Sequence, residues 1–133
     1  MKNIRSIIVA LPGTWQRVLT SNLKAYPMLE VVAVTHSSIN ALDLAEQLQP
    51  DLLMIDASIP VDDSVAIIKN ITKKQTDTAY IVLADTYQRR CLIAQAGADY
   101  VLSTFDFTAR ITSILDDIAK TKTENSGGIQ GHE

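Results

Sequence analysis

Residues 50–60 of the 133-residue chain read PDLLMIDASIP and carry the strongest structural signal in the sequence. The run from Leu52 to Ile55 is apolar at every position, which is typical of a strand that is buried on both faces of a parallel sheet. Asp56 ends this run with a carboxylate, and Pro60 follows a few residues later. Because functional groups of parallel α/β sheets gather beyond the carboxyl ends of the strands, Asp56 is the first candidate functional residue.

Similar apolar runs occur at residues 4–10, 30–35, 79–84 and 100–102, and segments with helical spacing lie between them. The clearest helical stripe is the last, which consists of Phe107, Ile111, Ile114, Leu115 and Ile118. Five alternating strand–helix pairs predict an α/β domain with a single doubly wound, five-stranded parallel sheet and five helices on its two faces. Gly97 stands where the fourth helix should end in a left-handed cap.

The last thirteen residues differ in character from the rest of the chain. Residues 121–133 read TKTENSGGIQGHE, which includes three of the five glycines and one large aliphatic residue. We therefore expect a domain over residues 1–120, followed by a flexible tail or linker over residues 121–133.

Composition excludes several classes of protein. A hydrophobic share of 47% with 20% charged residues supports a packed core and excludes disorder for most of the chain. A single cysteine, Cys91, excludes an intramolecular disulfide, and a net charge of −3 argues against nucleic-acid binding. No apolar stretch approaches the roughly 20 residues that span a bilayer, and no signal peptide is present, so we expect a cytoplasmic protein without membrane insertion.

Several segments resemble one protein family. PDLLMIDASIP is similar to the PDLVLMDLxMP motif of bacterial response-regulator receiver (CheY-like) domains, in which the strand-ending Asp accepts a phosphoryl group. AQAGADYVL at 94–102 resembles the AGAxxYL segment of the same family. YPMLEVVAV at 26–34 and INALDLAEQLQPD at 39–51 are most similar to receivers of LuxR/NarL-type regulators. The resemblance covers residues 4–119 and implies a flavodoxin-like sheet in the order 2-1-3-4-5.

The sequence departs from this family around the acceptor position. Ala10 and Leu11 stand where receivers carry two acids, Ala84 replaces a hydroxyl residue, and Ser103 replaces a lysine. In the family the acids hold Mg²⁺, and metal and lysine together neutralise the charge of the phosphoryl group. We therefore predict that Asp56 is an inherited phospho-acceptor position without activity, and we expect no metal and no cofactor.

Other side chains leave alternatives open near this position. Asp85, Asp62 or Asp63 could supply a replacement acid. Alternatively, Asp85 only caps the fourth helix, and Asp62 and Asp63 only stabilise the first turn of the third helix. Trp15 lies close to the missing acids in the predicted fold. Its indole could cover the emptied site, or it could pack beneath the neighbouring loop.

These features predict a degenerate receiver (a pseudo-receiver) of two-component signalling that is not an enzyme and acts by phosphorylation-independent protein–protein contact. The resemblance implies an interaction face on the fourth helix, fifth strand and fifth helix, suited to a protein partner or a homodimer; its candidate residues are Tyr87, Arg89, Arg90, Gln95 and Tyr100. One alternative is a functional receiver, phosphorylated at Asp56 by a histidine kinase with Mg²⁺. Another is the N-terminal receiver of a longer regulator with a DNA-binding or ATPase output domain.

Overall fold

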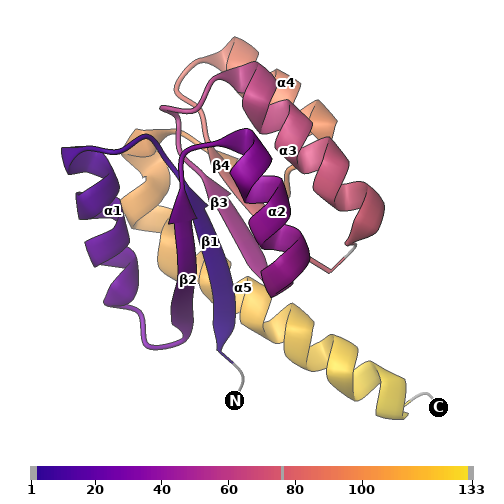
Figure 1. The fold of residues 1–133 in the computed structure, drawn as a ribbon. Helices are drawn as coiled ribbons and strands as arrows, with labels where there is room; N and C mark the ends of the chain where they lie inside the picture. The colour runs from indigo at the N-terminus through magenta and orange to yellow at the C-terminus, as the bar shows by residue number, and fades with distance from the viewer. Residues whose placement is uncertain (1–2, 76, 132–133) are drawn as a thin grey trace.

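The apolar runs form a parallel sheet in the computed structural model, which describes residues 3–75 and 77–131 (Figure 1). Its strands are β1 (Ile4–Val9), β2 (Leu29–Thr35), β3 (Leu52–Ile55), β4 (Ala79–Leu83) and β5 (Tyr100–Leu102). They lie in the order β2-β1-β3-β4-β5, and every neighbouring pair is parallel. The predicted fold class and strand order are therefore confirmed.

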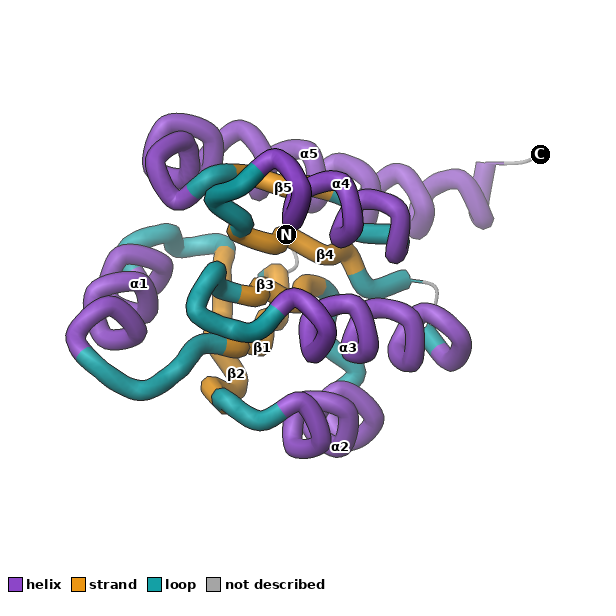
Figure 2. Tube along the Cα trace, turned by 90° about the horizontal axis from the view of Figure 1, so that it is seen from above, coloured by secondary structure: helices purple, strands orange, loops and turns teal. Residues whose placement is uncertain are grey.

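Helices follow each strand and cover both faces of the sheet. They are α1 (Thr14–Lys24), α2 (Ser38–Leu48), α3 (Val61–Lys74), α4 (Tyr87–Ala96) and α5 (Thr104–Gly131). Helices α1 and α5 pack on one face, and α2, α3 and α4 pack on the other (Figure 2). In β1, the Ile8 side chain packs on the face covered by α1 and α5, and the Ile7 side chain packs on the face covered by α2, α3 and α4. Both side chains are fully buried. Burial on two faces explains why β3 is apolar at every position and why β1 is apolar from Ile7 to Val9.

Capping residues fix where α2 begins and where α4 begins and ends. Ser37 caps α2 by accepting from the backbone N–H of Asn40, and Thr86 caps α4 by accepting from that of Arg89. Helix α4 ends at Gly97, whose φ of +114° is in the left-handed region. This confirms the predicted glycine cap, because a side chain is strained at such a φ angle.

The end of the chain differs in part from expectation. Backbone that was predicted to be a flexible tail continues as α5 to Gly131, and its last turns project past the sheet (Figure 1). Residues 132–133 lie outside the described residues, and a domain boundary at residue 120 stays a proposal. None of the helices in the described part of the chain is both long and apolar enough to cross a bilayer.

Candidate functional site

Three of the predicted site residues meet at the carboxyl edge of the sheet. The backbone N–H of Asp56 donates to the Val9 carbonyl at 2.8 Å, and that of Ala84 donates to the Leu102 carbonyl at 2.8 Å. The N–H of Ala10 likewise reaches the Thr35 carbonyl at 2.9 Å. Each hydrogen bond continues the strand ladder by one residue, so Asp56, Ala10 and Ala84 are fixed as firmly as the strands themselves.

The Asp56 carboxylate is only 2% exposed, and both of its oxygens accept a hydrogen bond. The indole Nε1–H of Trp15 donates to Oδ1 at 2.7 Å, and the backbone N–H of Ser58 donates to Oδ2 at 3.0 Å. The Ser58 hydroxyl in turn accepts from the backbone N–H of Leu11 at 3.1 Å. The carboxylate is therefore held by neutral donors, which satisfy it in a setting where an unpaired charge is costly.

Trp15 lies in the first turn of α1, and its contact decides between the two roles that the sequence left open. The indole covers the Asp56 carboxylate, while 40% of the side chain remains exposed. Gly13 leads into the helix with a φ of +145°, and Gln16 Nε2 donates to the Ala10 carbonyl at 2.9 Å. The loop after β1, which carries the acids in receivers, is thus tied to the start of α1. The first turn of that helix places the Trp15 indole against Asp56.

The alternative acids do not gather around Asp56. Asp85 accepts from the backbone N–H of Thr104 at 2.9 Å, so it serves the start of α5, while Thr86 caps α4. Asp62 and Asp63 lie exposed in the first turn of α3, where the helix dipole favours negative charge.

Ser103, at the position of the receiver lysine, accepts from the backbone N–H of Asp106 at 3.1 Å and so serves the start of α5. The side chains of Ala10 and Leu11 offer no oxygen to a metal. No group of three His, Cys, Asp or Glu side chains within the described residues could hold a metal ion. Mg²⁺ requires several hard oxygen ligands, and one buried carboxylate held by N–H donors does not fit it.

Comparison with known sequences gives distant relatives. No protein-family model matches the chain. It is 26% identical over 132 residues to a protein-glutamate methylesterase/protein-glutamine glutaminase of Alkalilimnicola ehrlichii, covering 96% of this chain and 33% of the relative. A protein of the same name from Hydrogenovibrio crunogenus is 27% identical over 124 residues, covering 93% and 30%. The chain thus spans about a third of the length of these curated relatives.

Comparison with solved structures is decisive for the fold. The signal receiver domain of NarL from Mycobacterium tuberculosis superposes with a TM-score of 0.76 at 17% identity, covering 90% of this chain and 98% of that one. The response regulator domain of Thermotoga maritima CheB gives 0.69 at 18% identity, covering 90% and 96%. The chain has the receiver fold. The regulatory domain of mrkE from Klebsiella pneumoniae agrees, with a TM-score of 0.76 at 17% identity over 89% and 97%.

Within this receiver fold, the predicted interaction face divides into exposed and structural residues. Tyr87 is 74% exposed, and Arg89 and Gln95 are also exposed on α4. Arg90 is half-buried and donates to the Ala84 carbonyl at 3.2 Å. Tyr100 is half-buried and packs against the core between the sheet and α1 and α5.

Sequence analysis missed two exposed apolar residues in the same elements. Leu92 on α4 is 51% exposed, and Phe105 at the start of α5 is 93% exposed. On α4 the buried apolar residue is Ile93, so Leu92 is left on the exposed side of the helix. A pattern search for apolar residues that fall outside the buried stripe of α5 could have found Phe105.

Proposed function

We propose that this protein is a pseudo-receiver, a signalling module that binds protein partners and is not switched by phosphorylation of Asp56. The observation that carries the proposal is the 2.7 Å hydrogen bond from the Trp15 indole to Asp56 Oδ1. Together with the Ser58 N–H on Oδ2, it places one neutral hydrogen-bond donor on each of the two oxygens that could attack a phosphodonor.

Phosphoryl transfer to a carboxylate brings two anions together, so it needs a cation and fixed donors to stabilise the transition state. Within the described structure, Asp56 forms no ion pair with a cation, its carboxylate accepts from the neutral donors of Trp15 and Ser58, and no group of three His, Cys, Asp or Glu side chains could hold a metal ion. To free Oδ1, Trp15 must also leave the carboxylate and give up a charge-assisted hydrogen bond. These conditions favour a closed, unmodified Asp56.

The exposed part of α4 supports contact with a protein partner, which can be a second copy of the chain. Tyr87 and Leu92 are largely exposed there, and Arg89 is an exposed arginine on the same helix. Exposed aromatic and arginine side chains are enriched at protein interfaces relative to the rest of a protein surface. Regulation would then follow from the presence and amount of the partner.

The test uses Trp15 itself, because it is the single tryptophan of the chain. We expect its fluorescence and the backbone amide spectrum to stay unchanged when Mg²⁺ is added with beryllofluoride or acetyl phosphate. Saturable changes that are absent in Asp56→Asn would show a working phospho-acceptor and overturn the proposal.

A gain-of-function variant provides the positive control. The variant Ala10→Asp, Leu11→Asp, Ala84→Thr, Ser103→Lys restores the receiver residues, and Trp15→Ala in the same background uncovers Asp56. We expect this variant to bind Mg²⁺ and to respond to beryllofluoride, and adding Asp56→Asn should abolish the response to beryllofluoride. Its response shows that the assay detects phosphoryl mimicry in this fold.

A second candidate function is that of a regulatory receiver within a longer protein. It is supported by the curated relatives, of which the matching segment is only about a third. In that arrangement the α4 surface would contact an output domain of the same chain. An antibody raised against residues 1–120 should then detect a native protein that is larger than the 133-residue chain. Detection of a product of this length alone would exclude the candidate.

A further inference from the structure

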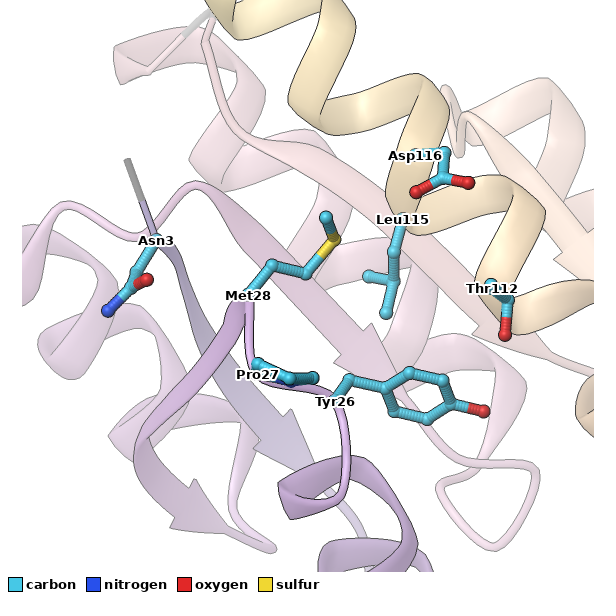
Figure 3. A pocket seen from close by; sticks show the side chains of 7 residues that line it. All are labelled: Asn3, Tyr26, Pro27, Met28, Thr112, Leu115 and Asp116. Atoms are coloured by element: carbon cyan, nitrogen blue, oxygen red, sulfur yellow. The ribbon is translucent and has the colours of Figure 1, made fainter. Parts of the chain in front are cut away.

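A pocket of about 350 Å³ lies at the edge of the sheet opposite to Asp56 (Figure 3). It opens where β1 and β2 begin, and the backbone N–H of Ile4 donates to the Met28 carbonyl there at 2.7 Å. One wall is the connection between α1 and β2, and the other is the middle of α5. Its lining residues are Asn3, Tyr26, Pro27, Met28, Thr112, Leu115 and Asp116.

The pocket has the composition of a small-molecule site. Its walls are mainly apolar: Figure 3 shows Tyr26, Pro27 and Met28 on the segment before β2, with Leu115 projecting from α5. Ligand pockets in proteins typically measure about 300–1,000 Å³, with apolar walls and a few polar groups that orient the ligand. The volume here lies near the lower bound of that range, so it suits a ligand with one ring or a short branched chain.

Asp116 is the one carboxylate among the residues that line the pocket, and no Lys, Arg or His lines it. The Asp116 side chain forms no hydrogen bond or ion pair with any described residue, and Lys120, one turn further along α5, is not paired with it. An apolar cavity with a single unpaired carboxylate at its rim is complementary to a cation that has an apolar body. An anion of the same size would be repelled, and a neutral analogue would lack the ion pair.

We propose that this pocket binds a small organic ammonium ion with an aromatic or branched aliphatic body. The body would pack against Met28 and Leu115, and the ammonium group would lie near the Asp116 carboxylate. The Tyr26 ring adds a face to which a cation is attracted. Because the pocket bridges α5 and the α1–β2 connection, a bound ligand would join two segments that are distant in sequence. This input is independent of Asp56 and goes beyond the function proposed above.

Methyl NMR gives a site-specific test, because the chain contains only three methionines. Met28 lines the pocket, whereas Met54 is 1% exposed in β3 and serves as an internal reference. The probes are 2-phenylethylammonium, its neutral analogue 2-phenylethanol and the anion 3-phenylpropanoate. We expect a saturable shift of the Met28 methyl signal, assigned with Met28→Leu, and no comparable shift at Met54.

We expect the cation to bind about three- to fivefold more tightly than the alcohol, which is the size of effect that an exposed charge pair produces. Asp116→Asn should remove this preference. Asp117→Asn is the matched control, because it removes an adjacent charge that does not line the pocket, and it should leave the preference intact. Thr112→Trp, at an exposed position on the rim, should fill the cavity and abolish the shift.

Three results would overturn the proposal. One is the absence of a saturable Met28 shift with the cation. Another is equal affinity of cation and alcohol in the unmodified protein. A third is an equal loss of preference in Asp116→Asn and Asp117→Asn, because that result would assign the effect to the general charge of α5. None of these outcomes depends on whether Asp56 can be phosphorylated.

Discussion

Trp15 and Asp56 are 41 residues apart in sequence and form the hydrogen bond that defines the candidate site. The carboxylate is almost fully buried, so its loss of solvent must be compensated by the indole and by the Ser58 N–H. A tryptophan in the first turn of α1 thereby takes over the contact with Asp56. At the scale of single residues, this contact is the basis for the proposal that Asp56 is not phosphorylated.

The hydrogen bond should contribute measurably to stability. Trp15→Phe keeps an aromatic ring but removes the Nε1–H donor, so we expect it to lower the free energy of unfolding by about 1–2 kcal/mol. Urea unfolding of Trp15→Phe, Asp56→Ala and the double variant gives the coupling energy between the two side chains. A coupling energy near zero would show that the hydrogen bond is not formed in solution.

Tyr80 gives a prediction for alkaline pH. Burial raises the pKa of this phenol above its ordinary value of 10.0; a weaker hydrogen bond from Thr72 lowers the pKa, and the nearby Asp99 charge raises it. Because the folded state holds the proton more tightly than the unfolded state, the stabilising contribution is complete below pH 10 and is lost as the pH rises through the folded pKa.

The free energy of unfolding should therefore fall above pH 10, and Tyr80→Phe should reduce the slope of this fall. Chemical denaturation across that pH range measures both slopes. Tyr26→Phe is a suitable control at a half-buried tyrosine in another part of the fold. Equal slopes for the unmodified protein and Tyr80→Phe would contradict the prediction.

Among the elements, the ends of α2 and α4 show how local backbone geometry limits the sequence. Gly97 has a φ of +114°, and a Cβ atom there would meet Ile68 Cγ2 at 3.7 Å, which is an ordinary contact. The cost of a side chain at this position is therefore conformational, and we expect Gly97→Ala to destabilise the fold by about 1 kcal/mol or more.

Gln49 follows the last residue of α2 with a φ of +49°, so here a residue with a side chain already occupies the left-handed region and glycine can be introduced. Gln49→Gly should be neutral or stabilising, because glycine occupies the left-handed region without strain and little else is lost there. The Gln49 side chain contributes only a hydrogen bond to the Glu46 carbonyl at 3.0 Å. Thermal unfolding of both variants measures the two effects. If Gln49→Gly destabilised the protein as much as Gly97→Ala, backbone strain could not be the cause.

In the whole molecule, α5 extends further than the core that it covers. The last buried residues of that core among the described side chains are Ile118 and, partly, Ala119. We therefore expect truncation after Lys120 to change the free energy of unfolding by less than about 0.5 kcal/mol. Truncation after Asp117 removes Ile118 as well and should cost about 2–4 kcal/mol. A large loss of stability on truncation after Lys120 would move the domain boundary beyond residue 120.

The order of elements could be predicted from the sequence because it follows from periodicity. Apolar runs at Ile4–Val9 and Leu52–Ile55 alternate with helical stripes, and this alternation permits few chain topologies. The position of Asp56 at the carboxyl edge of the sheet follows from the same pattern. The pattern also places Ala10 and Leu11 at that edge, and neither side chain has a carboxylate. The extent of α5 was not predicted, because glycines near the end of a chain indicate flexibility in the sequence alone.

The sequence by itself determined the receiver fold, the buried strand that ends in Asp56, and the apolar residues Ala10 and Leu11 at the end of β1. These features depend on residue type and spacing along the chain. Only the tertiary structure decided that Trp15 covers Asp56, that Asp85 serves the start of α5, and that the α1–β2 connection and α5 enclose a pocket. These contacts join residues far apart in sequence, and they depend on how packed helices place individual side chains, which no local pattern specifies.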